Sequence, residues 1–249
     1  MADELIPYDG PTKLVHTHSH TVYSTLDGVA TPEQYFSICK EREWPAMAIT
    51  EHGVMSSVPD NYFAAKSNGI KYIVGCEIYF NDYEPYRQRL MLEGGQAKLK
   101  EQPLAVQERV RRNRHLTVLA KNSKGVENLI KLTTQAYDTG MWYKPRIWFD
   151  KLVEYKEGLI ILSGCLNGPV AHEIRNGRLN PDWLNDNFKG ERNLGLSAME
   201  YVRLFKEHFG DDYFIELQMP RLEGGIDKTT EIKDENGTII KKLLSDVRV

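Results

Sequence analysis

The stretch LVHTHSHTVYSTLDG, which runs from Leu14 to Gly28, places histidines at the alternate positions 16, 18 and 20 and then an acid, Asp27. In an extended strand alternate side chains share one face, so this spacing predicts that the three imidazoles crowd together. Crowded imidazoles repel one another when protonated, and when neutral they are good ligands for a transition metal. The stretch therefore predicts a first strand that leads into a metal site.

Short apolar runs alternate with helical patterns along the rest of the chain. The predicted helix over 31–43 begins with Thr31 as N-cap and Pro32 in its first turn, and the next helix, over 59–69, ends at Gly69. Repeated strand–helix units with continuous apolar strands favour a parallel sheet or barrel covered by helices. The strands are predicted at 13–20, 46–52, 71–80, 115–121, 159–168 and 213–219, and two further helices at 125–140 and 197–210.

Candidate metal ligands lie at the ends of these strands. His52 ends the second strand, Glu77 lies in the third and Cys165 in the fifth. The carboxyl ends of parallel strands meet at one edge of a sheet, so we expect these side chains to converge with those of the first strand. His115 begins its strand, so the same rule places it less firmly. Imidazole, carboxylate and thiolate together favour Zn, Mn or Fe over Ca or Mg.

Each of these residues, taken alone, also has a purely structural interpretation. His52 is equally suited to a hydrogen-bonded turn, Glu77 to the surface, and Cys165 to the interior, where free cysteines usually lie. His172 and His208 lie in helical runs and are interpreted as ordinary surface or interface residues. The joint placement of the other residues at strand ends favours the metal site.

Composition excludes several functional classes. The 249 residues carry 32 Lys and Arg against 35 Asp and Glu, a net charge of −3, so no global basic field indicates nucleic-acid binding. No apolar run predicts a membrane span, and the first residues lack the pattern of a signal peptide. The three cysteines have no CxxC spacing and favour the reducing cytoplasm. P-loop and nucleophile-elbow motifs are absent from the sequence.

Two stretches interrupt the alternation of strands and helices. Residues 81–114 are polar and are predicted to form a solvated helical insertion; the alternative is a local nucleic-acid contact through Arg109, Arg111, Arg112 and Arg114. Residues 221–249 contain Asn236-Gly237, a pair typical of a tight hairpin. We predict a C-terminal hairpin or tail there, and an N-terminal extension over residues 1–12.

Taken together, these motifs resemble one known family. VHTHSHTVYSTLDG, AMAITEHG, IKYIVGCEIYF, HLTVLAKNSKGVENLIKL, WYKPRIWFD and GLIILSGCLNG occur in the order seen in the N-terminal PHP (polymerase and histidinol phosphatase) domain of bacterial-type DNA polymerase III alpha subunits, phage-encoded ones included. The resemblance covers residues 13–220, with 81–114 as an insertion. It implies an α/β fold, a distorted (βα)7 barrel that here lacks its final strand, and residues 221–249 would begin a continuation of the chain.

The resemblance also implies a site for up to three transition metal ions, Zn, Mn or Fe. Glu77 would bridge two of these ions. The site formed by Glu77, His115 and Cys165 is expected to be filled most completely. His16 and Glu51 would lie beside the ligands rather than on the metal. The full set of implied metal ligands is His18, His20, Asp27, His52, Glu77, His115 and Cys165.

Two departures from the family pattern bear on function. The usual TDHG is here Thr50-Glu51-His52-Gly53, and the family's final Asp-x-His motif has no counterpart after Gln218. The catalytic acids of a polymerase palm are also absent from this sequence. The resemblance implies a metal-dependent phosphoesterase, a 3′→5′ exonuclease acting in DNA replication.

The alternative is a non-catalytic module that stabilises a polymerase and docks a separate proofreading exonuclease. A stand-alone small-molecule phosphatase is the least favoured function, because YKPRI and LSGCLNG are phrases of the polymerase branch of the family. The implied partners are DNA, the remainder of the polymerase and an exonuclease subunit. No membrane partner is implied.

Overall fold

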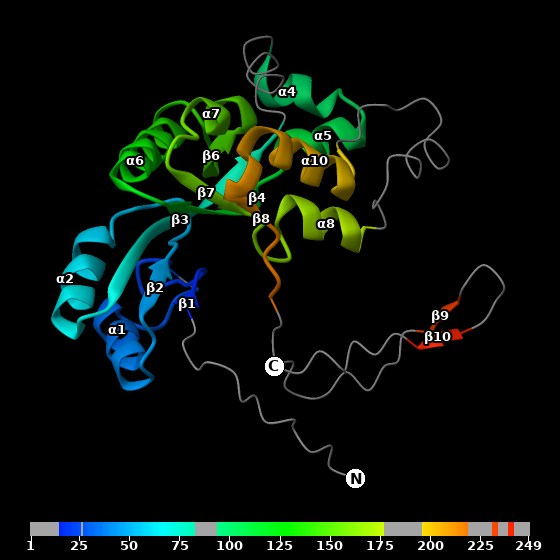
Figure 1. Cartoon of the computed structure of the whole chain (residues 1–249). Helices are drawn as coiled ribbons and strands as arrows, with labels where there is room; N and C mark the ends of the chain where they lie inside the picture. Colours follow the sequence, from blue (N-terminus) through cyan, green and yellow to red (C-terminus); the bar gives the residue numbers. More distant parts are fainter. Residues whose placement is uncertain are drawn as a thin grey trace. The chain divides into compact units, whose positions relative to one another are not determined.

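The computed structural model describes residues 15–25, 27–82, 94–176, 196–218, 231–233 and 239–241. The chain divides into two compact units, Met1–Ile215 and Glu216–Val249. The first unit carries a mixed sheet with helices packed against it (Figure 1). No helix among the described residues is long and apolar enough to cross a membrane.

The sheet of the first unit contains both parallel and antiparallel neighbours. Its main path is β1 (Val15–His16), β2 (Ala46–Ile49), β3 (Lys71–Asn81), β4 (Arg114–Ala120), β7 (Leu159–Leu162) and β8 (Tyr213–Phe214). The first three strands run parallel to one another, and β7 and β8 are also parallel. Beside the path, β6 (Lys144–Trp148) pairs with the end of β3 and with the short β5 (Met141–Trp142).

Strand β4 runs antiparallel to both β3 and β7, so the prediction of a wholly parallel sheet is wrong at this strand. The antiparallel direction of β4 determines where His115 lies. The beginning of β4 lies at the same edge as the ends of β3 and β7, and His115 is paired with Tyr79 near the end of β3. The rule for parallel strands could not place His115 at this edge, but the antiparallel pairing does.

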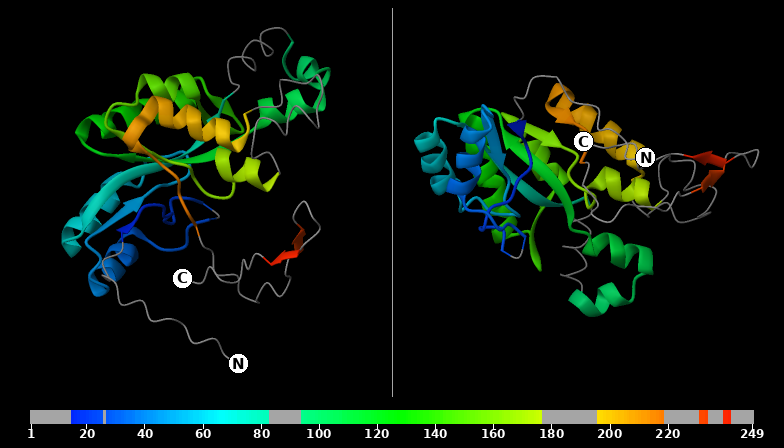
Figure 2. Two further views of the ribbon diagram at one scale, coloured as in Figure 1. Left: turned by 45° about the vertical axis from the view of Figure 1, so that its right-hand side comes forward. Right: turned by 90° about the horizontal axis from the view of Figure 1, so that it is seen from below.

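The sheet curls into a half-barrel, with β1 and β8 at its two ends (Figure 2). This mixed α/β architecture confirms the expected fold of the distorted-barrel type. A small apolar cluster joins Ala48, Leu119 and Leu162 from β2, β4 and β7. These side chains connect the parallel first part of the sheet with its antiparallel second part.

Helices α1 (Pro32–Glu41) and α2 (Val58–Asn68) cover β2 and the beginning of β3 (Figure 1). Thr31 caps α1 in a capping box with Gln34, and Gly69 ends α2 in the left-handed conformation, so both predicted helix boundaries are confirmed. The helices bury a cluster against the sheet that contains Phe36, Cys39, Met47, Ile49, Ala64 and Ala65.

The larger core lies beneath α6 (Ser123–Asp138), α7 (Phe149–Glu154), α8 (Pro169–Arg175) and α10 (Ala198–Phe209). Residues of β3, β4 and β7 pack here against these helices, with Phe205 and Tyr201 of α10 fully buried. Helix α10 begins with a capping box at Ser197 and is followed by the 3-10 helix η1 (Gly210–Asp212). Within the polar stretch 81–114 lie α4 (Gly95–Lys100) and α5 (Leu104–Arg111).

Two predicted strands are shorter than expected over the residues that the structure describes. Within these residues, β8 covers only the start of the range 213–218, and β1 pairs with β2 through Val15 and His16 alone. His16 is registered opposite Met47, a member of the cluster beneath α1, and its ring contacts that of Trp44 at a centroid distance of 4.7 Å. The prediction that all three alternate histidines share one face is therefore wrong, because extended pairing stops at His16.

The second unit contains β9 (Glu231–Lys233) and β10 (Ile239–Lys241), which pair antiparallel. The predicted turn at Asn236-Gly237 lies outside the described residues.

Candidate metal centre

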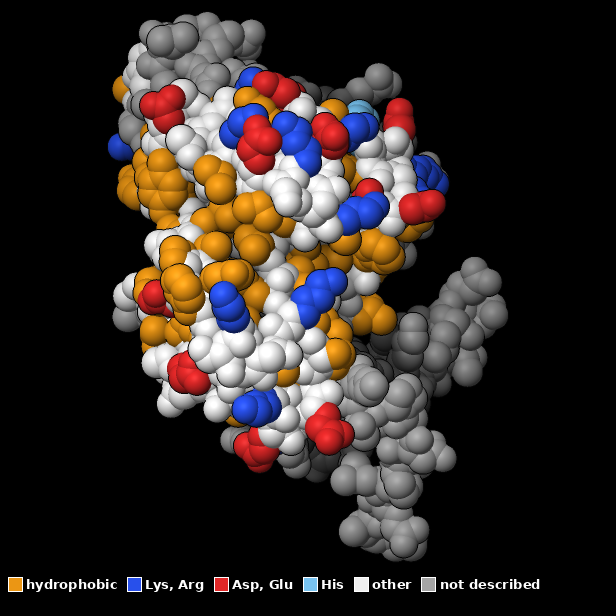
Figure 3. Space-filling model, turned by 60° about the vertical axis from the view of Figure 1, so that its left-hand side comes forward, with side chains coloured by type: hydrophobic (Ala, Val, Ile, Leu, Met, Phe, Trp, Pro, Cys, Tyr) orange, Lys and Arg blue, Asp and Glu red, His pale blue; other side chains and the backbone are white. Residues whose placement is uncertain are grey.

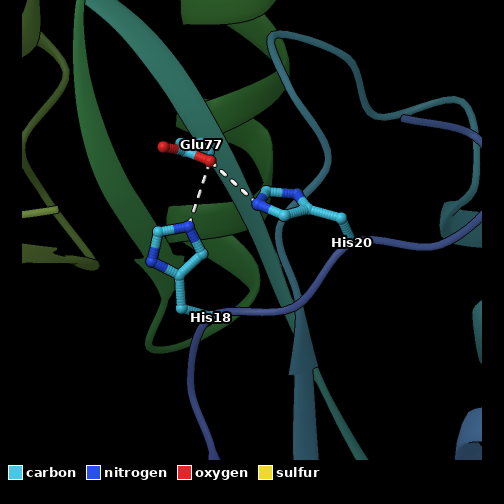
Figure 4. Close-up of side chains that lie close together, drawn as sticks. All are labelled: His18, His20 and Glu77. Atoms are coloured by element: carbon cyan, nitrogen blue, oxygen red, sulfur yellow. Dashed lines mark hydrogen bonds and ion pairs between the residues drawn. The ribbon is translucent and has the colours of Figure 1, made fainter. Parts of the chain in front are cut away.

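Glu77 is the centre of the candidate metal site. Its side chain is 1% exposed, and its Oε2 lies 3.0 Å from Nε2 of His18 and 2.9 Å from Nε2 of His20 (Figure 4). The other oxygen, Oε1, lies 2.7 Å from Nδ1 of His115 and 3.6 Å from Sγ of Cys165. The two carboxylate oxygens therefore lie beside two different groups of donor atoms, His18 and His20 on one side and His115 and Cys165 on the other.

These side chains come from segments far apart in the sequence. Glu77 lies within β3, and its backbone N–H donates to the carbonyls of Thr50 and Glu51, the two residues that follow β2. His52 forms an isolated parallel bridge with Glu77, which brings its imidazole to the same edge. His115 begins β4, and Cys165 follows β7 by three residues. The curl of the sheet thus assembles donors that no local segment could hold together.

A second group of donors surrounds Asp27 at the rim of the site. Its Oδ2 lies 2.9 Å from Nε2 of His52 and 3.8 Å from Nε2 of His20. His52 also reaches Glu77, with Nδ1 3.2 Å from Oε2, and its ring stacks on that of His20 at a centroid distance of 4.3 Å. The groups at Glu77 and Asp27 are therefore connected through His20 and His52.

Among the residues that the structure describes, three sets of donor atoms are compact enough to hold a metal ion: His18, His20 and Glu77; His20, Asp27 and His52; and His52, Glu77 and His115. Cys165 is close to the third set, with Sγ 3.7 Å from Nδ1 of His115. All seven ligands that were predicted from the sequence thus lie together, and their role as ligands remains a prediction. His16 belongs to none of these sets and lies against Trp44.

The donor set fits a transition metal. Imidazole nitrogens, carboxylate oxygens and a thiol suit Zn, Mn or Fe. In addition, Nδ1 of His52 is buried and, although it lies 3.2 Å from Oε2 of Glu77, it forms no hydrogen bond in the described part of the chain. A buried polar atom without a partner is costly, and a cation near Glu77 would satisfy it. The residues present are therefore compatible with bound metal ions.

Electrostatics keep the central carboxylate ionised. Burial alone would raise the pKa of Glu77, but hydrogen bonds from His115, His18 and His20 outweigh burial and hold that pKa well below its usual range. Burial lowers the pKa of His52, against the opposing charge of Glu77. An anionic carboxylate beside a neutral imidazole is the protonation pattern that metal ligation requires.

Glu51 supports the site without belonging to any of the three donor sets. Its buried carboxylate accepts a 2.6 Å hydrogen bond from Oγ of Ser24 and further bonds from the backbone N–H and hydroxyl of Thr21. Oγ of Ser24 in turn accepts the backbone N–H of His52 and lies 3.5 Å from Nδ1 of His20. Glu51 therefore fixes the loop that carries His20 and Asp27.

Two side chains that orient the candidate ligands, Thr117 and Ser24, were not predicted from the sequence. Oγ1 of Thr117 lies within hydrogen-bonding distance, 3.0 Å, of Nδ1 of His18, which directs the other ring nitrogen towards Glu77. Thr117 follows His115 by two positions in a strand and so shares its face, a signal that was present in the sequence. Ser24 carried no comparable signal, because it lies in an irregular loop.

Two side chains of the arginine run pair with a buried carboxylate rather than with residues of the candidate metal site. Arg112 and Arg114 form ion pairs of 3.8 and 3.6 Å with Glu173, whose side chain is fully buried in α8. Arg111 is exposed, and Arg109 lies in α5. The nucleic-acid contact of this run stays a prediction, and two of its four guanidinium groups are engaged inside the protein.

His172 and His208 lie in helices α8 and α10, as expected. His172 is adjacent to Glu173, with Nδ1 3.2 Å from its carboxylate. Nδ1 of His208 donates to the carbonyl of Leu204 in α10.

The fold is thus a mixed α/β half-barrel with candidate metal donors gathered at its strand ends. The profile of the PHP domain family matches residues 16–220, and the chain belongs to this family.

Among characterised proteins, the chain is similar to DNA polymerase III alpha subunits. It is 35% identical to that of Aquifex aeolicus over 204 residues, 33% identical to that of Treponema pallidum over 219, and 34% identical to that of Thermus aquaticus over 210. These alignments cover 82, 88 and 83% of this chain and only 15, 16 and 14% of the relatives. The chain therefore spans about one seventh of the length of the relatives that it matches.

The fold also has a distant likeness among solved structures. A metal-dependent phosphoesterase assigned in Bifidobacterium adolescentis is 16% identical, with 80% of this chain and 65% of that chain covered and a TM-score of 0.31.

Proposed function

We propose that this chain is the PHP domain of a replicative DNA polymerase, where it hydrolyses phosphodiester bonds with bound metal ions and releases nucleotides in the 3′→5′ direction. One observation carries the proposal. Both oxygens of the buried Glu77 face imidazoles from separate segments, His18 and His20 on one oxygen and His115 on the other. A carboxylate placed in this way can bridge two cations.

In this function, the residues of the site would bind the metal ions or orient the residues that bind them. Bound divalent cations would supply a Lewis acid for the phosphate and an acidified water. Glu77, His18 and His20 would hold one ion, and Glu77, His115 and Cys165 a second. Asp27 and His52 would contribute to a third. Thr117 orients the ring of His18, and Glu51 holds the loop of His20 and Asp27.

The experiment measures release of nucleotides from a single-stranded DNA labelled at its 3′ end. The purified chain is stripped with a chelator and reloaded with Mn²⁺, Zn²⁺ or Fe²⁺. We expect metal-dependent release that Glu77→Gln abolishes. Glu127→Gln removes a carboxylate that is 53% exposed on α6 and serves as the matched control. Absence of release with every metal, in protein that binds metal, would refute the catalytic proposal.

A second candidate function, docking within a larger polymerase assembly, is favoured by one surface. Hydrophobic side chains spread across the face in Figure 3, which is the side of α2 and α6 in Figure 1. Exposed apolar residues on these helices include Phe63, at 63% exposure, and Ile130, at 50%. Exposed apolar area of this kind marks protein interaction sites.

In this role the domain would contact the remainder of the polymerase and a separate exonuclease subunit in the cytoplasm. Binding of a purified exonuclease subunit should then survive Glu77→Gln and weaken in Phe63→Asp. The opposite pattern would exclude this surface as the docking site.

A further inference from the structure

A cavity of about 540 Å³ opens beside the candidate metal centre. At one end it is bounded by His18, His20 and Asp27, and at the other by side chains of α1 and of the turn that follows this helix. Its volume falls within the usual range of small-molecule sites, roughly 300–1,000 Å³. The space is therefore continuous with the metal ligands and large enough for a ligand that extends away from them.

The end remote from the ligands is built from flat and apolar groups. Trp44 contacts the ring of His16 and lies beneath the guanidinium of Arg42, whose Cζ is 5.6 Å from the indole centroid. Arg42 itself is exposed, and Ile38 adds an aliphatic side chain that is 41% exposed. An aromatic ring with an adjacent guanidinium plane is the kind of platform on which nucleobases stack.

The two ends of the cavity are held in fixed relation to each other. The hydroxyl of Tyr35, in α1, donates a 3.0 Å hydrogen bond to the backbone carbonyl of His20. The helix that carries the apolar wall is thereby tied to the segment that carries a metal ligand. A ligand that suits both ends has an anionic group beside His18 and His20 and a planar group that reaches Trp44.

We propose that this cavity binds the terminal nucleotide of the DNA strand, with its base stacked on Trp44 and Arg42 and its phosphate directed towards His18 and His20. This inference rests on the proposed phosphodiesterase function and assigns the residues that recognise its substrate. Stacking is tolerant of sequence, because every base has an aromatic face. The subsite would therefore accept all four nucleotides while rejecting a sugar phosphate without a base.

The test compares two probes by calorimetry with the full chain in Mn²⁺. Deoxyadenosine monophosphate (dAMP) carries the base, and 2-deoxyribose 5-phosphate lacks it. We expect dAMP to bind more tightly, and Trp44→Leu to weaken its binding roughly tenfold, the size expected for the loss of one stacked base. Binding of the sugar phosphate should not change. Trp44→Phe should restore most of the affinity, and Arg42→Ala, at an exposed position, should weaken dAMP by several-fold.

The matched control is Tyr62→Leu. Tyr62 lies on α2 beneath the ammonium of Lys66, whose Nζ is 5.9 Å from its ring centroid, so it forms a similar cation–aromatic pair outside the cavity. Equal affinity for the two probes, or equal effects of Trp44→Leu and Tyr62→Leu, would overturn the subsite. If circular dichroism shows that Trp44→Leu does not fold, the effect of Arg42→Ala and the comparison of the two probes still test the subsite.

The outcomes also separate the subsite from the proposed function. Base-dependent binding without nucleotide release would retain the subsite and refute the catalytic proposal. Nucleotide release without base-dependent binding would retain the catalytic proposal and refute the subsite.

Discussion

Ser24 donates a 2.6 Å hydrogen bond from its hydroxyl to the carboxylate of Glu51, and both side chains are buried. The bond joins the loop after β1 to the end of β2. Since the same hydroxyl accepts the backbone N–H of His52, one small network positions ligands from two segments. We therefore expect Glu51 to act on the candidate metal centre through the loop rather than as a metal ligand.

Glu51→Gln is expected to weaken transition metal binding without removing a ligand. The amide would present a donor to the N–H of Thr21, where the carboxylate now accepts, and the loop would loosen. Loss of an outer hydrogen-bond partner typically costs roughly 10–100-fold in metal affinity. A chelator competition titration measures the change, with Glu51→Asp as the variant that keeps the charge. Unchanged affinity in Glu51→Gln would show that Glu51 does not position the ligands.

Removal of metal is expected to lower the stability of the protein. A ligand that binds only the folded state stabilises it by roughly 2.7 kcal/mol at a hundredfold excess over its dissociation constant. Thermal unfolding should therefore shift to higher temperature on addition of Mn²⁺ or Zn²⁺. The double variant His18→Ala, His20→Ala should reduce this shift, because it removes one site, and Glu77→Gln, which alters the carboxylate shared by two sites, should abolish it. A full shift in Glu77→Gln would place the bound ion elsewhere.

Glu43→Gly is expected to stabilise the protein. Glu43 lies between α1 and β2 with a φ of 56°, in the left-handed region, and it is exposed. In this conformation a non-glycine residue is strained by about 1 kcal/mol or more. Glycine relieves this strain, and the stability that it loses through the greater conformational entropy of the unfolded chain is smaller. The free energy of unfolding in urea should rise by roughly 0.5–1 kcal/mol. Glu43→Ala keeps the strain, so an equal gain in that variant would contradict the explanation.

His172 makes stability depend on pH. Burial has the largest effect on the pKa of His172 and lowers it. The charge of Arg114 lowers this pKa further, and Glu173 acts in the opposite direction. In the range below the unfolded pKa of about 6.5, the unfolded state binds more protons than the folded state, so stability falls as pH falls. Replacement by glutamine removes this part of the dependence. We expect the free energy of unfolding to drop less between pH 7.5 and 5.5 in His172→Gln than in the parent protein, and equal drops would refute this.

Local chemistry explains which structural features could be predicted. The cap at Thr31 and the stop at Gly69 depend on neighbouring residues alone, and both boundaries follow from the sequence. The convergence of His52, Glu77 and Cys165 followed from a general rule about strand ends. These features need no knowledge of which strands pair.

Features that depend on pairing between distant segments could not be predicted. Nothing in HLTVLAK states that β4 runs antiparallel, because direction is set by its partners β3 and β7. The face occupied by His16 depends on where β1 leaves β2. The burial of Arg112 and Arg114 likewise requires Glu173, about sixty positions away, to lie in the same interior.

The candidate metal sites are expected to fill in a definite order. The site around Oε1 of Glu77 has three protein donors of its own, Glu77, His115 and Cys165, and three donors with water are sufficient for a catalytic zinc-type site. At the rim, Asp27 lies on an exposed loop and shares His20 and His52 with Glu77. We therefore expect the Oε1 site to fill first and the Asp27 site last. Anomalous diffraction at the metal edge measures each occupancy, and Cys165→Ser should lower the Oε1 site selectively. A filled Asp27 site beside an empty Oε1 site would show that the ligands are assigned wrongly.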